Sequence, residues 1–347
     1  MSAVEPDVLA PFLDDVPGIV VERLRGARRV LAVSHENPDA DTLGATLGVV
    51  ALVEALGGTA DAVCTDPVPA LYGFIAGVER FRTDPDLAAA YDLVVISDCG
   101  SLDRVGAVGV RHADLFARLP RVVIDHHASN DSKGEADWIE PHAAATCEMV
   151  ALLAARLGIP FRADDGDSRL ADALMAGIVM DTATFAHPNA TPRTLAVAAA
   201  LVAAGAPLSD ISRRLYRSKP TVQLQLFGRV LDRLAASADG RVVWSTMLTA
   251  DLAATGTVSS HSEGIIDLLA QADEAEVAIL FKEAEEGSAT RVSVRTKPGG
   301  VDATVLTGAF GGGGHARAAG ASVPLPVDQA RTPVLAEAVR LAAAVTR

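Results

Sequence analysis

The first half of the chain repeats one pattern: a short apolar run, rich in β-branched residues, is followed by acidic or histidine side chains. The apolar runs are 29–34, 92–97 and 121–124, and each predicts a buried strand. Apolar spacing typical of a helix follows the first run over 42–56, and Gly57 provides a stop signal. Strands that alternate with helices predict an α/β fold with a doubly wound parallel sheet.

Helical patterns continue along the middle of the chain. Further helices are predicted at 145–157, 168–180 and 194–204. The stretch 208–236 is helical and polar, and Pro220 interrupts it. This composition indicates a connector between two domains.

Shorter strands appear after the connector and predict a smaller α/β domain with its own sheet. Its expected strands lie at 241–248, 276–283 and 290–296, and its expected helices at 262–272 and 328–345. The predicted organisation is a catalytic domain over 1–205, a helical connector over 206–238 and a substrate-binding domain over 239–347.

Side chains that can bind metal follow each predicted strand of the first domain. They are His35, Asp39 and Asp41 after the first strand, Asp98 after the second, Asp125, His126 and His127 after the third, and Asp181 at the end of a helix. In open α/β sheets, ligands bind at the carboxyl ends of the strands. We therefore expect these residues to converge on one edge of the sheet.

Each of these signals has a simpler explanation when taken alone. Asp41 stands where the helix over 42–56 needs an N-cap, although His35 and Asp39 cannot cap the same helix. Asp181 ends an apolar helix, where the helix dipole repels an anion unless a cation is near or the side chain turns to solvent. The triplet 125–127 is also compatible with a hydrogen-bonded core network.

Together the residues predict a two-metal centre. Several carboxylates at one sheet edge would repel one another without cations. Mixed nitrogen and oxygen ligands without thiolate favour Mn²⁺, while Mg²⁺, Co²⁺ and Zn²⁺ stay open. Two such ions activate water and neutralise phosphoryl oxygens, which is typical of phosphoester hydrolysis. A third imidazole that binds no metal would stabilise the phosphoryl group or the leaving oxygen.

A glycine-rich stretch in the second domain predicts a nucleotide-binding cradle. Gly313 and Gly314 belong to a run of four glycines, and His315 and Arg317 follow it. Glycines let the backbone approach a ligand closely and turn its N–H groups toward an anion. Arg295 shares one face of the strand over 290–296 with another arginine and a serine by the period of two. A flexible loop is the alternative.

The composition limits which partners and which compartment are expected for this protein. The formal net charge is −14, so the protein lacks the bulk positive charge with which proteins grip duplex DNA, and small nucleotides or short oligonucleotides are expected instead. No apolar run reaches the about 18 residues that a membrane span needs. The first residues lack the order of a signal peptide, and three unpaired cysteines fit reduced thiols, so we expect a cytoplasmic protein.

The motifs resemble those of the DHH phosphoesterase superfamily along essentially the whole chain. The matching segments are the triplet at 125–127, the first motif at 35–41 and the glycine motif at 312–320. The length and the C-terminal domain are similar to those of NrnA-type enzymes, which act as oligoribonucleases and as phosphatases of 3′-phosphoadenosine 5′-phosphate (pAp). Relatives that cleave cyclic di-AMP through pApA to AMP are a further match, so that substrate stays open.

The resemblance implies specific roles. One metal would be held by His35, Asp39, Asp98 and Asp181, and the other by Asp41, Asp98, His126 and Asp181. The expected catalytic residues are Asp98 as a bridging ligand, His127 facing the scissile phosphate and Asp125 orienting its neighbours. The expected substrate contacts are Ser260, His261, Arg295, Gly313, Gly314, His315 and Arg317 in a cleft between the domains.

The resemblance also implies a homodimer, which is common among relatives. The alternative to an enzyme is a non-catalytic homologue that binds a dinucleotide without cleaving it. A missing metal ligand would favour that alternative, and none is missing at the positions that match the motifs.

Overall fold

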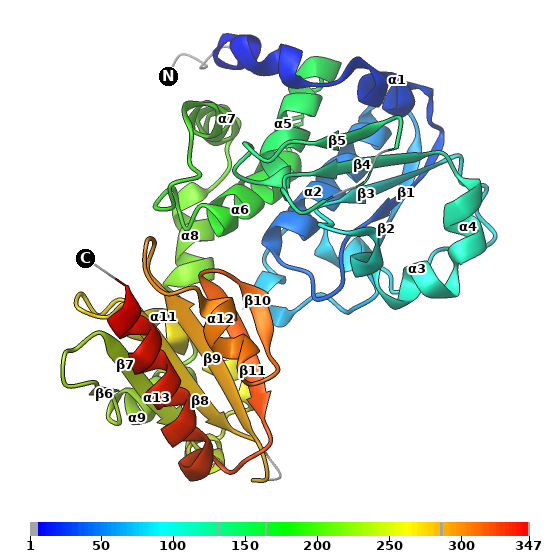
Figure 1. Cartoon of the computed structure of the whole chain (residues 1–347). Helices are drawn as coiled ribbons and strands as arrows, with labels where there is room; N and C mark the ends of the chain where they lie inside the picture. Colours follow the sequence, from blue (N-terminus) through cyan, green and yellow to red (C-terminus); the bar gives the residue numbers. More distant parts are fainter. Residues whose placement is uncertain (1–5, 131, 133, 164, 285–286, 346–347) are drawn as a thin grey trace. The chain divides into compact units, whose positions relative to one another are not determined.

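The computed structural model describes residues 6–130, 132, 134–163, 165–284 and 287–345 (Figure 1). The chain forms two compact units, Met1–Ser218 and Lys219–Arg347, and each has its own sheet. The boundary lies inside the segment that the sequence predicts as a connector. Two α/β units confirm the predicted fold class.

The first unit contains a five-stranded, entirely parallel sheet. Its strands are β1 (Arg29–Val33), β2 (Thr59–Val63), β3 (Leu93–Ser97), β4 (Arg121–Asp125) and β5 (Asp137–Ile139), in the order β2-β1-β3-β4-β5. The sequence predicts β1, β3 and β4 but misses the edge strands β2 and β5. Both carry aspartates and β5 has only three residues, so they lack the continuous apolar run of a central strand.

Helices cover both faces of this sheet, as expected for a doubly wound fold (Figure 1). One face carries α1 (Gly18–Gly26), α2 (Ala40–Ala55), α5 (Thr146–Leu157) and α6 (Arg169–Asp181). The other carries α3 (Ala107–Arg111) and α4 (Ala113–Arg118). Further segments of this unit are η1 (Pro6–Asp15), η2 (Ala70–Tyr72), η3 (Val78–Arg80), η4 (Leu102–Val105), α7 (Pro192–Ala203) and α8 (Leu208–Tyr216). Alternate strand residues point into the two cores.

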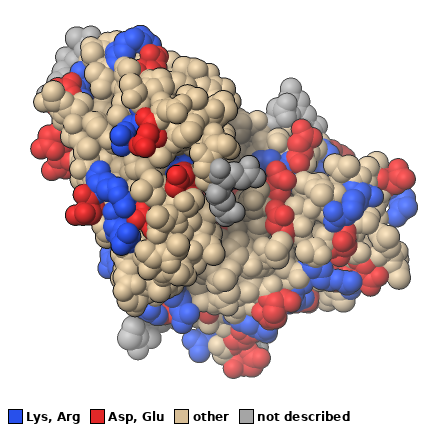
Figure 2. Space-filling view, turned by 90° about the horizontal axis from the view of Figure 1, so that it is seen from below, with Lys and Arg blue, Asp and Glu red and all other residues tan. Residues whose placement is uncertain are grey.

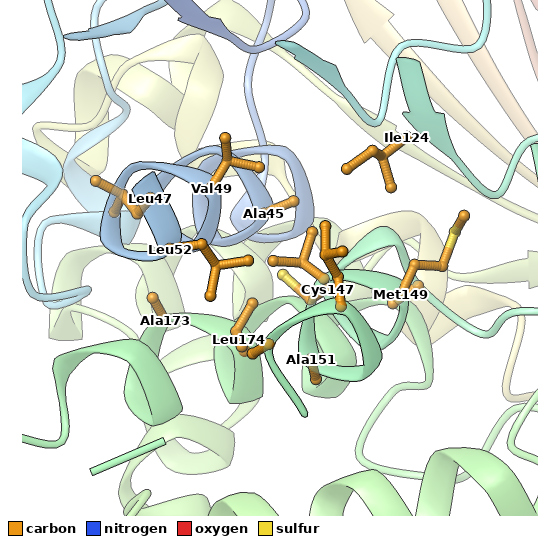
Figure 3. Packing of buried hydrophobic residues seen from close by; sticks show 14 of the residues in the cluster. Ala45, Leu47, Val49, Leu52, Ile124, Cys147, Met149, Ala151, Ala173 and Leu174 are labelled. Atoms are coloured by element: carbon orange, nitrogen blue, oxygen red, sulfur yellow. The ribbon is translucent and has the colours of Figure 1, made fainter. Parts of the chain in front are cut away.

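Helices α2, α5 and α6 meet in an unusually close junction (Figure 3). A methyl group on Gly44 of α2 would lie 2.3 Å from the carbonyl oxygen of Ala173 in α6. A methyl group on Gly177 of α6 would lie 2.4 Å from both Oδ1 of Asp41 and Sγ of Cys147. Glycine is therefore required at these positions because neighbouring helices occupy the space of a side chain. This junction places α2 and its Asp41 directly beside the start of α5.

The second unit contains a six-stranded mixed sheet. Its strands are β6 (Ala235–Ala236), β7 (Val242–Met247), β8 (Val277–Glu283), β9 (Thr290–Thr296), β10 (Gly313–His315) and β11 (Ala318–Val323), in the order β10-β11-β9-β8-β7-β6. Only β7 and β8 pair in parallel among these strands. Helices α9 (Thr221–Leu231) and α11 (Ile265–Leu269) pack on one face, and α12 (Ala303–Gly308) and α13 (Val327–Ala344) on the other. Helix α10 (Thr249–Thr255) packs beside α9.

Two predicted elements of this unit differ from the structure. The helix expected at 262–272 is divided into a 3-10 turn, η5 (Ser259–Ser262), and α11, because Gly264 between them has a φ of 89°. The glycine stretch expected as a cradle loop contains strand β10, which pairs with β11. Among the described residues, no single helix has the length and hydropathy to cross a membrane, and only the bent pair α7 and α8 passes when taken together.

We expect Gly44→Ala to destabilise the first unit by about 1–3 kcal/mol, because the added methyl group overpacks the α2–α6 contact. Urea unfolding followed by circular dichroism measures this change. Gly26→Ala is the matched control, since a methyl group there meets no atom within 4 Å. Equal midpoints for the two variants would contradict the close packing.

Candidate functional site

His35 follows β1 and is 2% exposed. Its Nδ1 lies 2.6 Å from the carbonyl oxygen of Glu36, which can only accept, so Nδ1 carries the proton. The Arg104 guanidinium, 3.2 Å from the same nitrogen, is then a second donor and not a hydrogen-bond partner. Burial lowers the pKa of His35 and favours the neutral ring. The lone pair of Nε2 therefore faces carboxylate oxygens of Asp98 at 3.5 Å and Asp39 at 3.9 Å.

His126, directly after β4, repeats this arrangement. Its Nδ1 lies 3.3 Å from the carbonyl oxygen of Ala143, which again assigns the proton to Nδ1. Its Nε2 lies 3.5 Å from Oδ1 of Asp98 and 3.2 Å from Oδ2 of Asp181. Both imidazoles thus direct Nε2 toward carboxyl oxygens while a backbone carbonyl holds Nδ1. Metal-binding histidines are held by backbone carbonyls in the same way.

Asp98 lies between the two imidazoles at the end of β3. Its Oδ2 faces His35 and its Oδ1 faces His126. Its φ of 57° is left-handed, a conformation that costs a residue with a side chain roughly 1–2 kcal/mol. Burial first, and then neighbouring carboxylates such as Asp41, raise the pKa of Asp98 well above its usual range. The backbone strain and the raised pKa together make this position a candidate functional one.

The candidate ligand atoms form groups in which all members lie within 4.8 Å of one another. The groups are His35, Asp39 and Asp98; Asp41, His126 and Asp181; and Asp98, His126 and His127. The six predicted metal ligands are therefore brought together at one edge of the sheet, next to the point where the strand order reverses between β1 and β3. Their nitrogen and oxygen donors fit divalent cations.

The two aspartates at the start of α2 have exchanged the structural roles that the sequence suggests. The simpler explanation of Asp41 as the cap of this helix is wrong, and so is the expectation that Asp39 cannot cap it. Asp39 is the N-cap, and its Oδ1 accepts from the backbone N–H groups of Asp41 and Thr42. Asp41 instead caps α5 from a distance. Its two carboxylate oxygens accept from the backbone N–H groups of Thr146 at 2.7 Å and Cys147 at 2.9 Å.

His127 and Asp125 form a second, separate pair. Oδ1 of the fully buried Asp125 lies 2.7 Å from Nδ1 of His127, and Oδ2 accepts from the amide of Asn130. Burial opposes the charged form of Asp125, but these hydrogen bonds outweigh it and lower its pKa. The same hydrogen bond raises the pKa of His127, whose side chain is 34% exposed. Asp125 thus orients His127, and the outer nitrogen of the ring is left for a ligand.

The predicted substrate contacts lie in the second unit, and strand register groups several of them. His315 pairs with Ala318, which pairs with Arg295, so these three side chains lie on one face of the sheet. Gly313 lies two residues along on the same face. A methyl group on Gly313 would meet no atom within 4 Å. The protein's own packing therefore does not require glycine there, whereas a methyl group on Gly314 would lie 2.6 Å from the carbonyl oxygen of Ala318.

The remaining predicted contacts have protein partners. Arg317 donates to the carbonyl oxygens of Lys297 at 2.6 Å and Val301 at 3.2 Å, so its guanidinium holds a turn of its own unit. Arg295 lies 3.0 Å from Asp267 at a surface pair that a ligand anion can replace. Ser260 and His261 lie in η5, where Nδ1 of His261 accepts from the backbone of this turn.

Sequence reasoning missed three polar residues around the site, two of which, Thr146 and Glu148, are fully buried. Thr146 donates its hydroxyl hydrogen to Oδ1 of Asp98 at 3.0 Å. Glu148, fully buried, binds Arg193 at 2.6 Å and holds α5 against α7. Asn130 binds the second oxygen of Asp125. The one available signal was a threonine at the start of a helix without a capping side chain before it.

Comparisons with known proteins agree with this arrangement. The description "DHH family, N-terminal domain" matches residues 29–178, and "DHHA1 domain" matches residues 245–344. The bifunctional oligoribonuclease and PAP phosphatase NrnA of Thermus thermophilus is 32% identical over 93% of this chain and 93% of its own. The Bacillus subtilis protein of the same name is 27% identical over 83% of this chain and 87% of its own.

The fold is also similar to that of a solved structure. It is an exopolyphosphatase-related protein from Bacteroides fragilis, with a TM-score of 0.81 and 19% identity, covering 93% of this chain and 96% of its own.

We expect wild-type protein treated with a chelator to gain thermal stability when Mn²⁺ is added. We also expect Asp98→Asn to be more stable than wild type with chelator and less stable with Mn²⁺. With chelator the variant melts higher, because a buried carboxylate among other carboxylates is removed; with Mn²⁺ it melts lower, because a ligand is lost. Differential scanning fluorimetry measures both states. Asp114→Asn, an exposed position on α4, is the control.

The same measurement has a defined pH dependence. The pKa of Asp98 is raised in the folded state, so the folded chelated protein binds a proton more tightly than the unfolded chain. The stability that this proton binding contributes is fully present below the carboxyl pKa of the unfolded chain, and it is lost as pH rises through the pKa of the folded state. Asp98→Asn should flatten this fall, and an unchanged slope would contradict the assigned charge.

Proposed function

The chain belongs to the DHH family, and from this premise we propose that it is a phosphoester hydrolase with two divalent cations, Mn²⁺ in the first place. Its proposed substrates are short oligoribonucleotides, linear dinucleotides and pAp, with cyclic di-AMP cleaved through pApA to AMP as a further substrate. The observation that carries the proposal is the pair of imidazoles, His35 and His126, whose Nε2 atoms face the two oxygens of Asp98.

The groups of candidate ligand atoms support the ligand sets that the family resemblance implies. His35 and Asp39 would hold one cation, and Asp41 and His126 the other, with Asp98 shared. Asp181, 3.2 Å from His126, belongs with the second group; its predicted contact with the first cation stays a prediction. Bound cations would supply Lewis-acid activation of water and neutralise phosphoryl charge.

His127 would act on the phosphoryl group itself. Asp125 fixes its orientation through Nδ1 and stabilises its positive form. The Nε2–H group can then donate to a phosphoryl oxygen or to the leaving oxygen, which carries the charge that develops as the ester bond breaks. Asn130 holds the far oxygen of Asp125 and keeps that carboxylate from turning away.

The second unit would bind the rest of the nucleotide. One face of its sheet carries Arg295 and His315. Gly313 on the same face has no side chain, so a ligand could approach the backbone there. Lys282 and Arg291 are paired across strands β8 and β9 and add positive charge. Gly314, Ser260 and His261 complete the proposed set, and Arg317 would support it indirectly by holding the turn that follows β9.

Because the overall charge is negative, a few positively charged groups close to the substrate would have to bind its phosphates. The net charge is −14, and on the face drawn in Figure 2 acidic and basic side chains are interspersed. Duplex DNA needs a continuous basic surface, so a short, single nucleotide or oligonucleotide held by a few groups is the better fit. A proposed homodimer follows from the family resemblance alone.

A binding homologue without turnover is the alternative function. It would need the same metal groups and the same sheet face but no hydrolysis. Complete ligand sets and the oriented His127 favour the enzyme, because a protein that only binds has no need for a raised imidazole pKa beside the metal groups.

We expect His127→Ala to lower kcat on pAp by about 10²- to 10⁴-fold, because the donor to the phosphoryl group is lost. Phosphate release with Mn²⁺ present measures the rate, and circular dichroism confirms folding. The exposed His142→Ala is the control and should keep the wild-type rate. If His127→Ala stays within about threefold of wild type, the role assigned to this imidazole is wrong.

We expect Gly313→Ala to raise KM by roughly tenfold without loss of stability, because the methyl group fills space reserved for the ligand and not for the protein. Steady-state kinetics and thermal melting separate the two effects. Gly308→Ala, also in open space within the second unit, is the control.

A competition among pAp, linear diadenylate and cyclic di-AMP, with Mn²⁺ and chromatographic detection, tests the substrate class. We expect the two linear substrates to be consumed first, because each offers a terminal phosphate group. Effective competition by cyclic di-AMP would instead assign the protein to turnover of that cyclic dinucleotide. Hydrolysis of none would favour the binding homologue.

A further inference from the structure

Thr146, the first residue of α5, touches candidate ligands of both metal groups. Its hydroxyl donates to Oδ1 of Asp98 at 3.0 Å, across 48 residues of sequence. Its backbone N–H donates to Oδ2 of Asp41 at 2.7 Å, across 105 residues. The residue is fully buried, so water cannot replace either hydrogen bond.

The start of α5 explains why these contacts form. Ala145 is the N-cap of the helix and has no side chain that can bind the free N–H groups of the first turn. Asp41 satisfies two of them, at Thr146 and Cys147, and the positive end of the helix dipole faces its carboxylate. Asp41 is thereby held in one orientation by backbone atoms, which no single substitution on α5 removes.

The Thr146 hydroxyl provides the corresponding restraint on Asp98. The imidazole nitrogens of His126 and His127 lie 3.5 Å from Oδ1 of Asp98, beyond the distance of a good hydrogen bond. The hydroxyl at 3.0 Å is closer. It fixes the rotation of the carboxylate so that Oδ2 stays directed to His35 and Oδ1 to His126.

We infer that Thr146 is a positioning residue that sets the spacing of the two metal groups, through its hydroxyl on Asp98 and its backbone N–H on Asp41. This inference rests on the proposed two-metal function. The hydroxyl keeps one carboxylate shared between the groups, and the backbone keeps a ligand of the second group in register with it. Loss of the hydroxyl leaves Asp98 free to turn toward one group and vacate the other.

The test is Thr146→Val, which keeps the shape of the side chain and removes only the hydroxyl. Equilibrium binding of Mn²⁺ and electron paramagnetic resonance of the loaded protein are measured without any assay of activity. We expect about 10- to 100-fold weaker binding of one ion and loss of the signal from coupled Mn²⁺ pairs. Thr146→Ser, which restores a hydroxyl, should recover most of both.

Thr307→Val is the matched control. Its hydroxyl is also buried in a helix, but it donates to the carbonyl oxygen of Ala303 in the second unit. This variant should bind Mn²⁺ like wild type, which separates a local effect from the general cost of losing a buried hydroxyl. If Thr146→Val does not fold, Thr146→Ala provides the same comparison with Thr146→Ser.

Two failures can be told apart. If the wild-type protein binds no pair of Mn²⁺ ions, the proposed metal centre fails. If the wild type binds a coupled pair and Thr146→Val or Thr146→Ala binds it equally well, the centre stands and the role of Thr146 is wrong. Equal losses in Thr146→Ser and Thr146→Val would also overturn the role, because the hydroxyl would then not be the cause.

Discussion

Repulsion among buried carboxylates is the constraint around which the first unit is built. Asp98 is buried at the end of β3 with other acids close by, and the pKa values of Asp98 and Asp181 are raised well above the usual range, first by burial and then by these neighbours. Folding alone gains nothing from such a cluster. Two histidines, each held at Nδ1 by a backbone carbonyl, direct Nε2 into it. Divalent cations would offset the repulsion, and that would link the stability of this sheet edge to the proposed chemistry.

The packing of helices places these groups with the required precision. The junction of α2, α5 and α6 is so close that Gly44 and Gly177 have no room for a methyl group. This closeness brings Asp41 of α2 onto the free N–H groups at the start of α5. The same helix start supplies Thr146 to Asp98. Helices α2 and α6 thus hold Asp41 and Asp181, while the other candidate ligands lie outside helices and strands, at His35, Asp39, Asp98 and the 126–127 pair.

Charge in this protein is arranged locally and not globally. A net charge of −14 would repel an anionic substrate at long range, but screening limits that effect to about 8–10 Å at physiological salt. At short range each unit presents its own positive or hydrogen-bonding groups: His127 in the first unit, and the face with Arg295 and His315 in the second. This arrangement favours small ligands that reach a few groups at once over long polyanions that lie across the surface.

The sequence by itself determined the features that depend on local pattern and residue chemistry. Apolar runs gave β1, β3 and β4, and the acids and histidines after them marked the sheet edge, because strand period and ligand chemistry are readable within a few residues. The sequence did not predict the edge strands β2 and β5, because their segments mix polar and apolar residues and become strands only by pairing with a neighbour. Only the tertiary structure decided that Asp39 caps α2 while Asp41 caps α5, and that Arg317 holds a turn. The role of Thr146 likewise depends on contacts across 48 and 105 residues, which spacing along the chain cannot contain.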